Sequence, residues 1–385
     1  MKISYISTFY PLRGGIAHFN TLFYKTLTLR GHSVKAITFS RQYPKLLFPG
    51  KTQDEQAGET EFYKTGAEVL LDSINPLSWM QVALRVVEQS PDAVLFKYWI
   101  PFFAPCYFVI SLFVKLFSRA KVIYILDNFI PHEKRFGDGA LRWLATRFVD
   151  GYIAMSDAVE HDLTRELPEA RYKKSSHPVY DIFGEPVEKN IARAQLGIDQ
   201  NAEVILFFGY IRKYKGLDVL LDAMPEIVKS KPRLKLLVVG EFYGDEQFYR
   251  EKIGAMNLWP FITLVSDYVP NEHVAGYFCA SDAVVLPYRS ATQSGIVQIA
   301  YHFARPAIVT GVGGLGEVVI DGKTGFVVPP ESPAPLAAAV IRFFGDTETG
   351  FEANVKAEQK KYTWEAFAEA FEDLNRGLNT RDSHN

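Results

Sequence analysis

The chain has 385 residues, of which 48% are hydrophobic and 22% charged, with a formal net charge of -2 at pH 7. This composition excludes an intrinsically disordered chain, and the length predicts two domains because one hydrophobic core rarely serves so many residues. Two widely separated cysteines, Cys106 and Cys279, give no support for a disulfide framework or a zinc site.

Short strand-like runs alternate with helical patterns along the chain. In order, the runs are 3–7, 33–39, 93–98, 121–126, 151–155, 204–209, 234–239, 261–265, 283–286 and 307–310. This alternation predicts an α/β architecture in which helices cover both faces of parallel sheets, and it occurs twice. We expect one domain over 1–185, a second over 186–362 and a C-terminal helix with a polar tail over 363–385, with the Pro- and Gly-bearing segment 177–186 as linker.

The first predicted strand is too short for the apolar region of a secretory signal, so we expect a cytoplasmic protein. Residues 1–50 hold seven Lys or Arg and no Asp or Glu. A basic first half suits an anionic acceptor or an anionic membrane surface, whereas scattered cations on a solvated face are the alternative explanation.

The first chemical motif follows this strand. Gly14 and Gly15 precede a predicted helix over 18–29, so their backbone amides and the helix N-terminus can approach an anionic ligand. The spacing Gly-x-Gly-x-x-Gly of a dinucleotide-binding turn is absent, which disfavours an oxidoreductase. A loop shaped only by turn geometry is the alternative.

Residues 98–114 form the most hydrophobic segment of the sequence. The segment is shorter than the roughly 20 residues that a bilayer requires, and Pro101 and Pro105 interrupt it, so we expect a buried helix against the first sheet. The alternative is peripheral contact with an anionic membrane through aromatic side chains and nearby cations. These cations are Lys97, Lys115, Arg119 and Lys121.

The segment 207–218 is the most informative part of the chain. It ends an apolar run and then places Arg212 and Lys215 just before a predicted helix that begins at Leu217. Ligands of parallel sheets bind beyond the carboxyl ends of the strands, so two cations at this turn suit a diphosphate. An ordinary solvated surface turn is the alternative.

Two later turns have a related composition. One follows the run that ends at Leu286 and opens a helix at Gly295, where Thr292, Ser294 and Gly295 can cap the helix while their amides point at an anion. The other is rich in glycine and leads into Glu317. At the first turn the alternative is a helix cap that binds no ligand. At the second, the alternative is that Glu317 serves only as an acid that stabilises the first turn of a helix, without a ligand.

The order of these motifs resembles that of retaining GT-B glycosyltransferases related to sugar-transferase family 4. The resemblance runs through nearly the whole chain, from the Gly14-Gly15 loop through 209–216 to 313–317 and 321–329. It implies two Rossmann-like domains that face each other across a cleft. The N-terminal domain would bind the acceptor, the C-terminal domain a nucleotide sugar, and the terminal helix would cross back to the first domain.

Site residues follow from the resemblance by position. Arg212 and Lys215 would bind the diphosphate and stabilise the charge of the leaving group, while Gly14, Gly15 and Gly209 would lie near the donor phosphates. The sequence has no Asp-x-Asp to hold a metal ion, so we expect transfer without a metal or any other cofactor.

The sequence also departs from the family. Two glutamates are usual eight positions apart before an Arg-Pro pair, and Ala291 and Ile299 stand in their places. The polar candidates for holding donor hydroxyls are Gln293, Ser294 and Gln298, with Glu317 beyond them. The usual N-domain histidine is also replaced, so Asp127 or His132 is expected to orient an acceptor hydroxyl or to act on a proton; a loop histidine with a backbone partner is the alternative for His132.

We therefore predict a retaining, nucleotide-sugar-dependent hexosyltransferase that extends a glycan, a glycolipid or a lipid-linked acceptor, with no nucleic acid partner. Three alternatives remain: a GT-B sugar-nucleotide epimerase, a nicotinamide-dependent oxidoreductase and a non-catalytic glycan-binding module. Product analysis, cofactor absorbance and saccharide binding without donor consumption, respectively, distinguish them.

Overall fold

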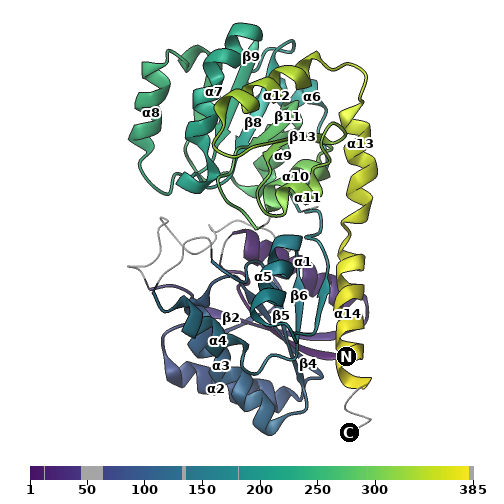
Figure 1. The fold of residues 1–385 in the computed structure, drawn as a ribbon. Coiled ribbons are helices and arrows are strands. Elements are labelled where there is room, and N and C mark those ends of the chain that lie inside the picture. Colours follow the sequence, from purple (N-terminus) through teal and green to yellow (C-terminus); the bar gives the residue numbers. More distant parts are fainter. Residues whose placement is uncertain (13, 45–63, 132–135, 181, 293, 381–385) are drawn as a thin grey trace. The chain divides into compact units, whose positions relative to one another are not determined.

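The computed structural model of the protein describes residues 1–12, 14–44, 64–131, 136–180, 182–292 and 294–380. The chain packs as two compact units, Met1–His177 with Trp364–Asn385, and Pro178–Thr363 (Figure 1). The expected boundary at 185 comes after this division. The reason is that Tyr180 and Phe183 are buried in the second unit, so the linker segment contributes to that core.

The first unit is built on a seven-stranded parallel sheet of order β3-β2-β1-β4-β5-β6-β7. Its strands are β1 (Lys2–Ile6), β2 (Ser33–Arg41), β3 (Glu68–Asp72), β4 (Ala93–Tyr98), β5 (Lys121–Leu126), β6 (Gly151–Ala154) and β7 (Tyr172–Lys174). Every residue of β4 and β5 is buried, as expected for central strands that helices cover on both faces. The sequence patterns missed β3 and β7, the two edge strands.

Helices lie on both faces of this sheet (Figure 1). They are α1 (Gly15–Leu29), α2 (Pro76–Gln89), η3 (Pro101–Phe103), α3 (Ala104–Phe117), α4 (Asp138–Thr146), α5 (Asp157–Glu166) and α14 (Trp364–Thr380). Helices α2, α3 and α4 pack side by side over one face, whereas α1 and α14 pack together on the other. The helix expected in the hydrophobic segment is thus present as α3. The expected polar tail after the terminal helix is wrong as far as Thr380, because α14 continues to that residue.

The terminal helix α14 is part of the core of the first unit. The ring of Phe367 lies edge-on to two rings of α1, with centroids 5.3 Å from Phe19 and 5.0 Å from Phe23. At the rim, Glu372 accepts hydrogen bonds of 2.8 Å from Arg30 and faces the His32 ring nitrogen at 2.8 Å. The hydrogen bond from Arg30 is the main cause that lowers the pKa of Glu372 to about 2.

The second unit has a six-stranded parallel sheet of order β10-β9-β8-β11-β12-β13. Its strands are β8 (Glu203–Phe208), β9 (Leu234–Val239), β10 (Ile262–Val265), β11 (Ala283–Leu286), β12 (Ala307–Thr310) and β13 (Gly325–Val328). Alternate residues of β8 face opposite sides. Phe207 belongs to the core under α7 and α12, while the ring of Phe208 lies 5.0 Å from that of Phe278 on α9. The predicted α/β class, with two parallel sheets of Rossmann-like topology, is therefore confirmed.

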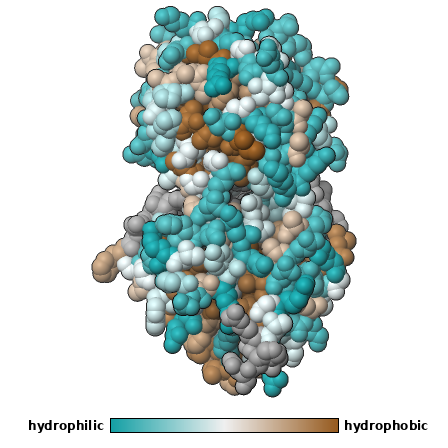
Figure 2. Space-filling view, turned by 45° about the vertical axis from the view of Figure 1, so that its right-hand side comes forward, coloured by the Kyte–Doolittle hydropathy of each residue, from teal (hydrophilic) through white to brown (hydrophobic). Residues whose placement is uncertain are grey.

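The helices of this unit include three short 3-10 turns. They are α6 (Lys189–Gln195), η4 (Lys213–Lys215), α7 (Leu217–Ser230), α8 (Glu246–Ala255), η5 (Trp259–Phe261), α9 (Asn271–Ala280), α10 (Gly295–His302), α11 (Leu315–Val318), α12 (Pro333–Gly345), α13 (Phe351–Glu358) and η6 (Gln359–Lys361). No helix in the described segments combines the length and apolar composition needed to cross a bilayer. The face visible in Figure 2 is mostly hydrophilic, and hydrophilic side chains interrupt its hydrophobic areas.

Each sheet has one point at which the order of its strands reverses. The chain adds β2 and β3 on one side of β1 and then returns to place β4 on the other side. In the second sheet the same reversal lies between β8 and β11. The loops after two such strands leave toward opposite faces, so ligands of parallel sheets bind at this point, beyond the carboxyl ends. The topology thus indicates one candidate ligand site in each unit.

Replacing Phe367 by Ala should lower the free energy of unfolding of the first unit by about 3–5 kcal/mol, since it removes a fully buried ring from the α1–α14 contact. Urea unfolding followed by tryptophan fluorescence measures this, because four of the five tryptophans lie in the first unit. The matched control is Phe248→Ala on α8, whose side chain is 48% exposed. Equal effects of the two substitutions would contradict an integral role of α14.

Candidate functional site

The loop after β8 carries the two predicted cations. Gly209 has a φ of +96°, which favours glycine and turns the chain away from the sheet. Arg212 precedes the turn η4, which ends in Lys215. Gly216 then starts α7 with a φ of +69°, and a Cβ atom there would lie only 2.0 Å from the carbonyl oxygen of Pro287. The loop is therefore held by close backbone contact with the loop after β11, on the other side of the strand-order reversal.

Neither cation has a carboxylate partner among the residues that the structure describes. Within the parts of the chain that the structure describes, no acidic side chain lies within 4.0 Å of Arg212 or Lys215. Lys215 is only 8% exposed, and burial, with Arg212 nearby, lowers its pKa to about 7. The Arg212 guanidinium lies 4.8 Å from the ring centroid of Tyr243, which stacks on Tyr210. A buried cation without a counter-ion is costly, so this pair forms a site that an anion would complete.

A third cation of the same region is neutralised. Arg289, on the loop after β11, pairs with Asp218 at 2.7 Å and with Glu331 at 2.8 Å. The hydrogen bond from Arg289 also lowers the pKa of Asp218, although burial of that carboxyl has the opposite effect. Arg289 therefore fixes the loops to each other, whereas Arg212 and Lys215 are left to face a ligand.

The N-terminus of α10 lies beside Lys215. A Cβ atom at Gly209 would be 3.1 Å from the Lys215 amine and 3.2 Å from the side chain of Ile296, so both flank this glycine. Ser294 caps the helix, since its hydroxyl accepts a 3.3 Å hydrogen bond from the Ile296 amide, and the Tyr288 hydroxyl lies 3.4 Å from it. A cation next to the free amides of a helix N-terminus is an arrangement that binds phosphate.

Two further residues shape this N-terminus. Tyr180 packs against Gly295 so closely that a Cβ atom there would lie 3.0 Å from the tyrosine ring. Gln298, one turn along α10, is 1% exposed, and its Oε1 atom has no hydrogen-bond partner among the described residues. A buried oxygen without a donor costs free energy, so a ligand hydroxyl is a suitable partner for Gln298.

The predicted site residues fall into two groups. The second unit brings together Gly209, Arg212, Lys215, Ser294, Gly295 and Gln298. The first unit places Gly14, Gly15 and Asp127 at the carboxyl edge of its own sheet. His132 and Gln293 lie outside the described residues.

Glu317 lies in the short helix α11 after β12. It is half-buried, and its charge is a minor contribution to the raised pKa of Tyr362, after burial and Glu358. The loop after β12 is tied to the loop after β11 by a 2.8 Å hydrogen bond from the Gly314 amide to the Thr292 carbonyl. Across the described residues, no group of three or more His, Cys, Asp or Glu side chains could hold a metal ion.

Sequence reasoning missed several residues at these edges. The aromatic contacts of Tyr180, Tyr243 and Tyr288 connect segments far apart in the chain and leave no local pattern. Lys97 did leave a signal, because it is the only charged residue in the apolar strand β4. The alternative in which Lys97 contacts lipid is wrong, since the side chain is 1% exposed and pairs with Asp127.

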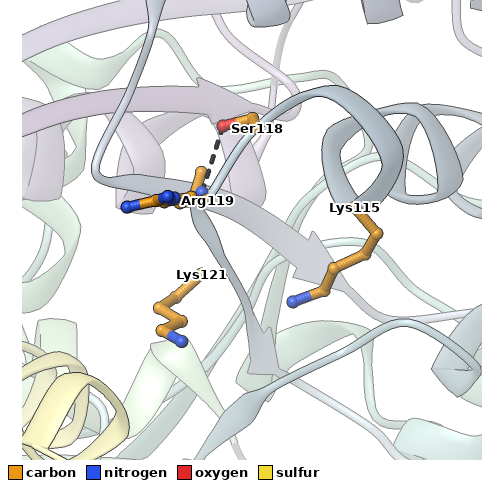
Figure 3. Close-up of a pocket in the computed structure, with 5 residues that line it drawn as sticks. Lys115, Ser118, Arg119 and Lys121 are labelled. Carbon is orange, nitrogen blue, oxygen red and sulfur yellow. Dashed lines mark hydrogen bonds between the residues drawn. The ribbon is translucent and has the colours of Figure 1, made fainter. Parts of the chain in front are cut away.

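A basic hollow lies at the amino end of β5, opposite the carboxyl edge of the first sheet, where α3 ends and β5 begins (Figure 3). Lys115, Arg119 and Lys121 line it, together with Ser118 and Ala120. The Ser118 hydroxyl accepts a 3.0 Å hydrogen bond from the Ala120 amide, and Lys115 pairs with Asp150. Two large apolar side chains next to the hollow are exposed. They are Leu116 (62%) and Phe117 (63%).

Residues 202–346 match the family described as glycosyl transferases group 1. A D-inositol 3-phosphate glycosyltransferase of Segniliparus rotundus is 31% identical over 200 residues, which cover 48% of this chain and 42% of the relative. An alpha-D-kanosaminyltransferase of Streptomyces kanamyceticus is 25% identical over 225 residues, 56% of this chain and 57% of the relative. This chain spans about half the length of the curated relatives it matches.

Solved structures resemble the chain over its whole length. Sucrose-phosphate synthase from Thermosynechococcus elongatus superposes with a TM-score of 0.72 and 18% identity, covering 99% of this chain and 100% of that one. Anabaena HepE in complex with UDP gives a TM-score of 0.70 at 18% identity, with 100% of both chains covered. At such identities the likeness concerns the fold alone, and it agrees with the predicted GT-B fold.

Replacing Lys215 by Met should stabilise the protein in a pH-dependent way. Folding lowers the pKa of Lys215 from 10.5 to about 7, so the unfolded chain holds more protons between those values. The cost of burying the charge is complete below pH 7 and disappears as the pH rises toward 10.5. At pH 6 we expect the variant to be more stable by at least about 1.4 kcal/mol, the equivalent of one pKa unit.

Urea unfolding at pH 6 and pH 10 measures this difference, with Lys213→Met, an exposed neighbour in the same turn, as the control. A Lys215→Met protein that is less stable than the parent at pH 6 would show that the buried charge is compensated.

Proposed function

We propose that this chain, whose second unit is a glycosyl transferases group 1 domain within a GT-B fold, transfers a hexosyl group from a nucleotide sugar to a glycan, a glycolipid or a lipid-linked acceptor. The observation that carries the proposal is the pair Arg212 and Lys215, which no described carboxylate neutralises and which lies beside the N-terminus of α10. The second unit would hold the donor and the first unit the acceptor.

The chemistry of glycosyl transfer explains the value of this arrangement. When the bond between the sugar C1 and the diphosphate oxygen breaks, both electrons stay with the diphosphate. Lys215 is buried and the amides at Gly295 belong to a helix, so they are in place before the reaction and stabilise that charge without reorganisation, and the exposed Arg212 adds a second cation. A bound diphosphate also favours the charged form of Lys215, and Gln298 would accept a hydrogen bond from a donor hydroxyl.

Transfer without a metal ion is part of the proposal, because two protein cations face the diphosphate and the sequence has no Asp-x-Asp. Retention of configuration is also part of it, and would follow if the acceptor attacks from the face that the diphosphate leaves. Under this proposal the donor contacts of Gly14 and Gly15 come from the first unit, and His132, Gln293 and Glu317 keep the roles expected from the sequence.

Replacing Arg212 or Lys215 by Ala should each lower kcat by about a hundredfold, as the loss of a single preorganised donor does. The measurement is release of nucleoside diphosphate in the presence of acceptor, with Lys213→Ala, an exposed cation of the same turn, as the control. Unchanged turnover in both variants would remove the assignment.

A thermal-shift screen identifies the donor class and separates the alternatives. UDP, GDP, ADP, dTDP, NAD and NADP are tested with magnesium and with a chelator, since a ligand that binds only the folded state raises Tm. We expect one nucleoside diphosphate to raise Tm equally in both conditions and to have no effect on Arg212→Ala. A shift with NAD or NADP alone would favour an oxidoreductase, and free sugar among the products would favour an epimerase.

Peripheral contact with the cytoplasmic face of an anionic membrane is a further part of the proposal. Lys115, Arg119 and Lys121 line the basic hollow (Figure 3). Leu116 and Phe117, next to them in the chain, are exposed. Apolar side chains beside cations suit the boundary between phospholipid headgroups and acyl chains. A lipid-linked acceptor would then lie in the membrane to which the protein binds.

The double substitution Phe117→Ser and Arg119→Glu should abolish binding to vesicles of phosphatidylglycerol and phosphatidylcholine in equal parts, because it removes one apolar contact and reverses one charge. Co-sedimentation at low and high salt measures the binding. Phe248→Ser, at an exposed apolar position of the second unit, is the control. Binding of the parent protein to pure phosphatidylcholine with equal strength would contradict the electrostatic part.

A further inference from the structure

A lysine is buried at the carboxyl edge of the first sheet. Lys97, the fifth residue of β4, is 1% exposed. Its Nζ atom lies 3.0 Å from the Asp127 carboxylate, 3.2 Å from the ring centroid of Phe19 and 3.5 Å from the sulfur of Met155. Strands β4 and β5 are neighbours, with Lys97 paired to Ile125, so Asp127 follows β5 beside it.

This ion pair is expensive for the fold. Burial lowers the pKa of Lys97 to about 8, while Asp127 acts in the opposite direction and keeps the amine charged at neutral pH. Replacing a buried ion pair by apolar side chains of similar size is often neutral or stabilising, so such a pair is weak evidence for stability. Groups with strongly shifted pKa values at a ligand-binding edge are more often functional.

The two partners of the ion pair differ in their exposure to solvent. The side chain of Asp127 is 13% exposed, whereas that of Lys97 is 1% exposed. Lys97 is also anchored through its backbone, because its carbonyl accepts a 3.1 Å hydrogen bond from the Tyr107 hydroxyl. The carboxylate therefore reaches the edge of the sheet, and the lysine supports it from behind.

The surroundings of the pair are also fixed. On α1, Asn20 accepts a 2.6 Å hydrogen bond from the Tyr5 hydroxyl and donates 2.8 Å hydrogen bonds to the Ser7 hydroxyl and the Thr8 carbonyl. This buried network orders the start of the loop after β1, at Ser7 and Thr8. Phe19, on the same helix, covers Lys97, so the glycine loop and the ion pair flank the reversal of strand order between β1 and β4.

We propose that Asp127 accepts a hydrogen bond from the acceptor hydroxyl and that Lys97 is a positioning residue, which holds the Asp127 carboxylate in place and ionised. This inference rests on the proposed glycosyl transfer. The acceptor oxygen forms a bond to the sugar C1 as the bond from C1 to the diphosphate breaks. The hydroxyl proton passes to the leaving diphosphate, which also takes the electron pair, so Asp127 ends the step as it began.

Charge favours an acceptor hydroxyl over the donor at this edge. A carboxylate repels a diphosphate but accepts a hydrogen bond from a neutral hydroxyl, which it thereby orients. The positive groups suited to the diphosphate, Arg212 and Lys215, belong to the second unit. The two sites thus have opposite chemistry, which places the cations for the donor diphosphate in the second unit and the hydrogen-bond acceptor for a polyhydroxylated acceptor at Asp127.

Three variants test the proposal: Asp127→Asn, Lys97→Met, and the double variant Lys97→Met with Asp127→Leu. Each should lower transfer to the acceptor at least tenfold, with binding of nucleoside diphosphate by the second unit unchanged. Lys97→Met alone should also lower Tm, because it removes the ion-pair partner of a largely buried carboxylate. In the double variant Tm should recover and transfer should not, which separates a functional pair from a structural one.

Arg85→Met is the control, because it removes a cation that is also paired with a carboxylate of the first unit, Glu68, which begins β3 at the opposite end of the sheet. We expect normal transfer and a normal KM for the acceptor. Recovery of transfer in the double variant would overturn the proposal, as would a loss confined to donor binding. Failure of the proposed function itself would look different, since the parent protein would then bind no nucleoside diphosphate or would release free sugar without transfer to the acceptor.

Discussion

Parallel pairing of the central strands is the constraint on which the rest of the structure depends. Because both sheets are parallel, every connection crosses over a face, and the loops that follow the strands gather at one edge. The reversals of strand order, at β1 and β4 and at β8 and β11, then select one point on each edge. The cations of the second unit and the buried ion pair of the first occur at these two points.

Desolvation gives the two sites their chemistry. Lys97 and Lys215 are both largely removed from water, and burial lowers the pKa values to about 8 and about 7. Their neighbours differ, since Lys97 faces a carboxylate and Lys215 faces Arg212. The first site is thus balanced and presents a hydrogen-bond acceptor, whereas the second carries excess positive charge beside a helix N-terminus. A protein selected for stability alone would keep neither arrangement.

Much of the fold could be predicted from the sequence, because buried parallel strands appear as apolar runs between turn residues. The observed limits of β4, β5, β9, β11 and β12 are those expected. The missed strands lie at sheet edges, where fewer side chains are buried: β7, for example, is Tyr172–Lys174 with no buried residue. The unit boundary was misplaced because Tyr180 and Phe183 pack into a core whose other members lie far along the chain.

The sequence by itself determined that two parallel α/β units exist and that Arg212 and Lys215 follow a strand, since apolar periodicity and turn residues are local properties. Only the tertiary structure decided which charges are neutralised. Arg289 forms an ion pair with Asp218, which is 71 positions away in the chain. Lys97 forms one with Asp127, which follows the neighbouring strand. Arg212 and Lys215 form no ion pair with a described carboxylate. The physical reason is that electrostatic balance and burial depend on distances in space, which the order of residues does not specify.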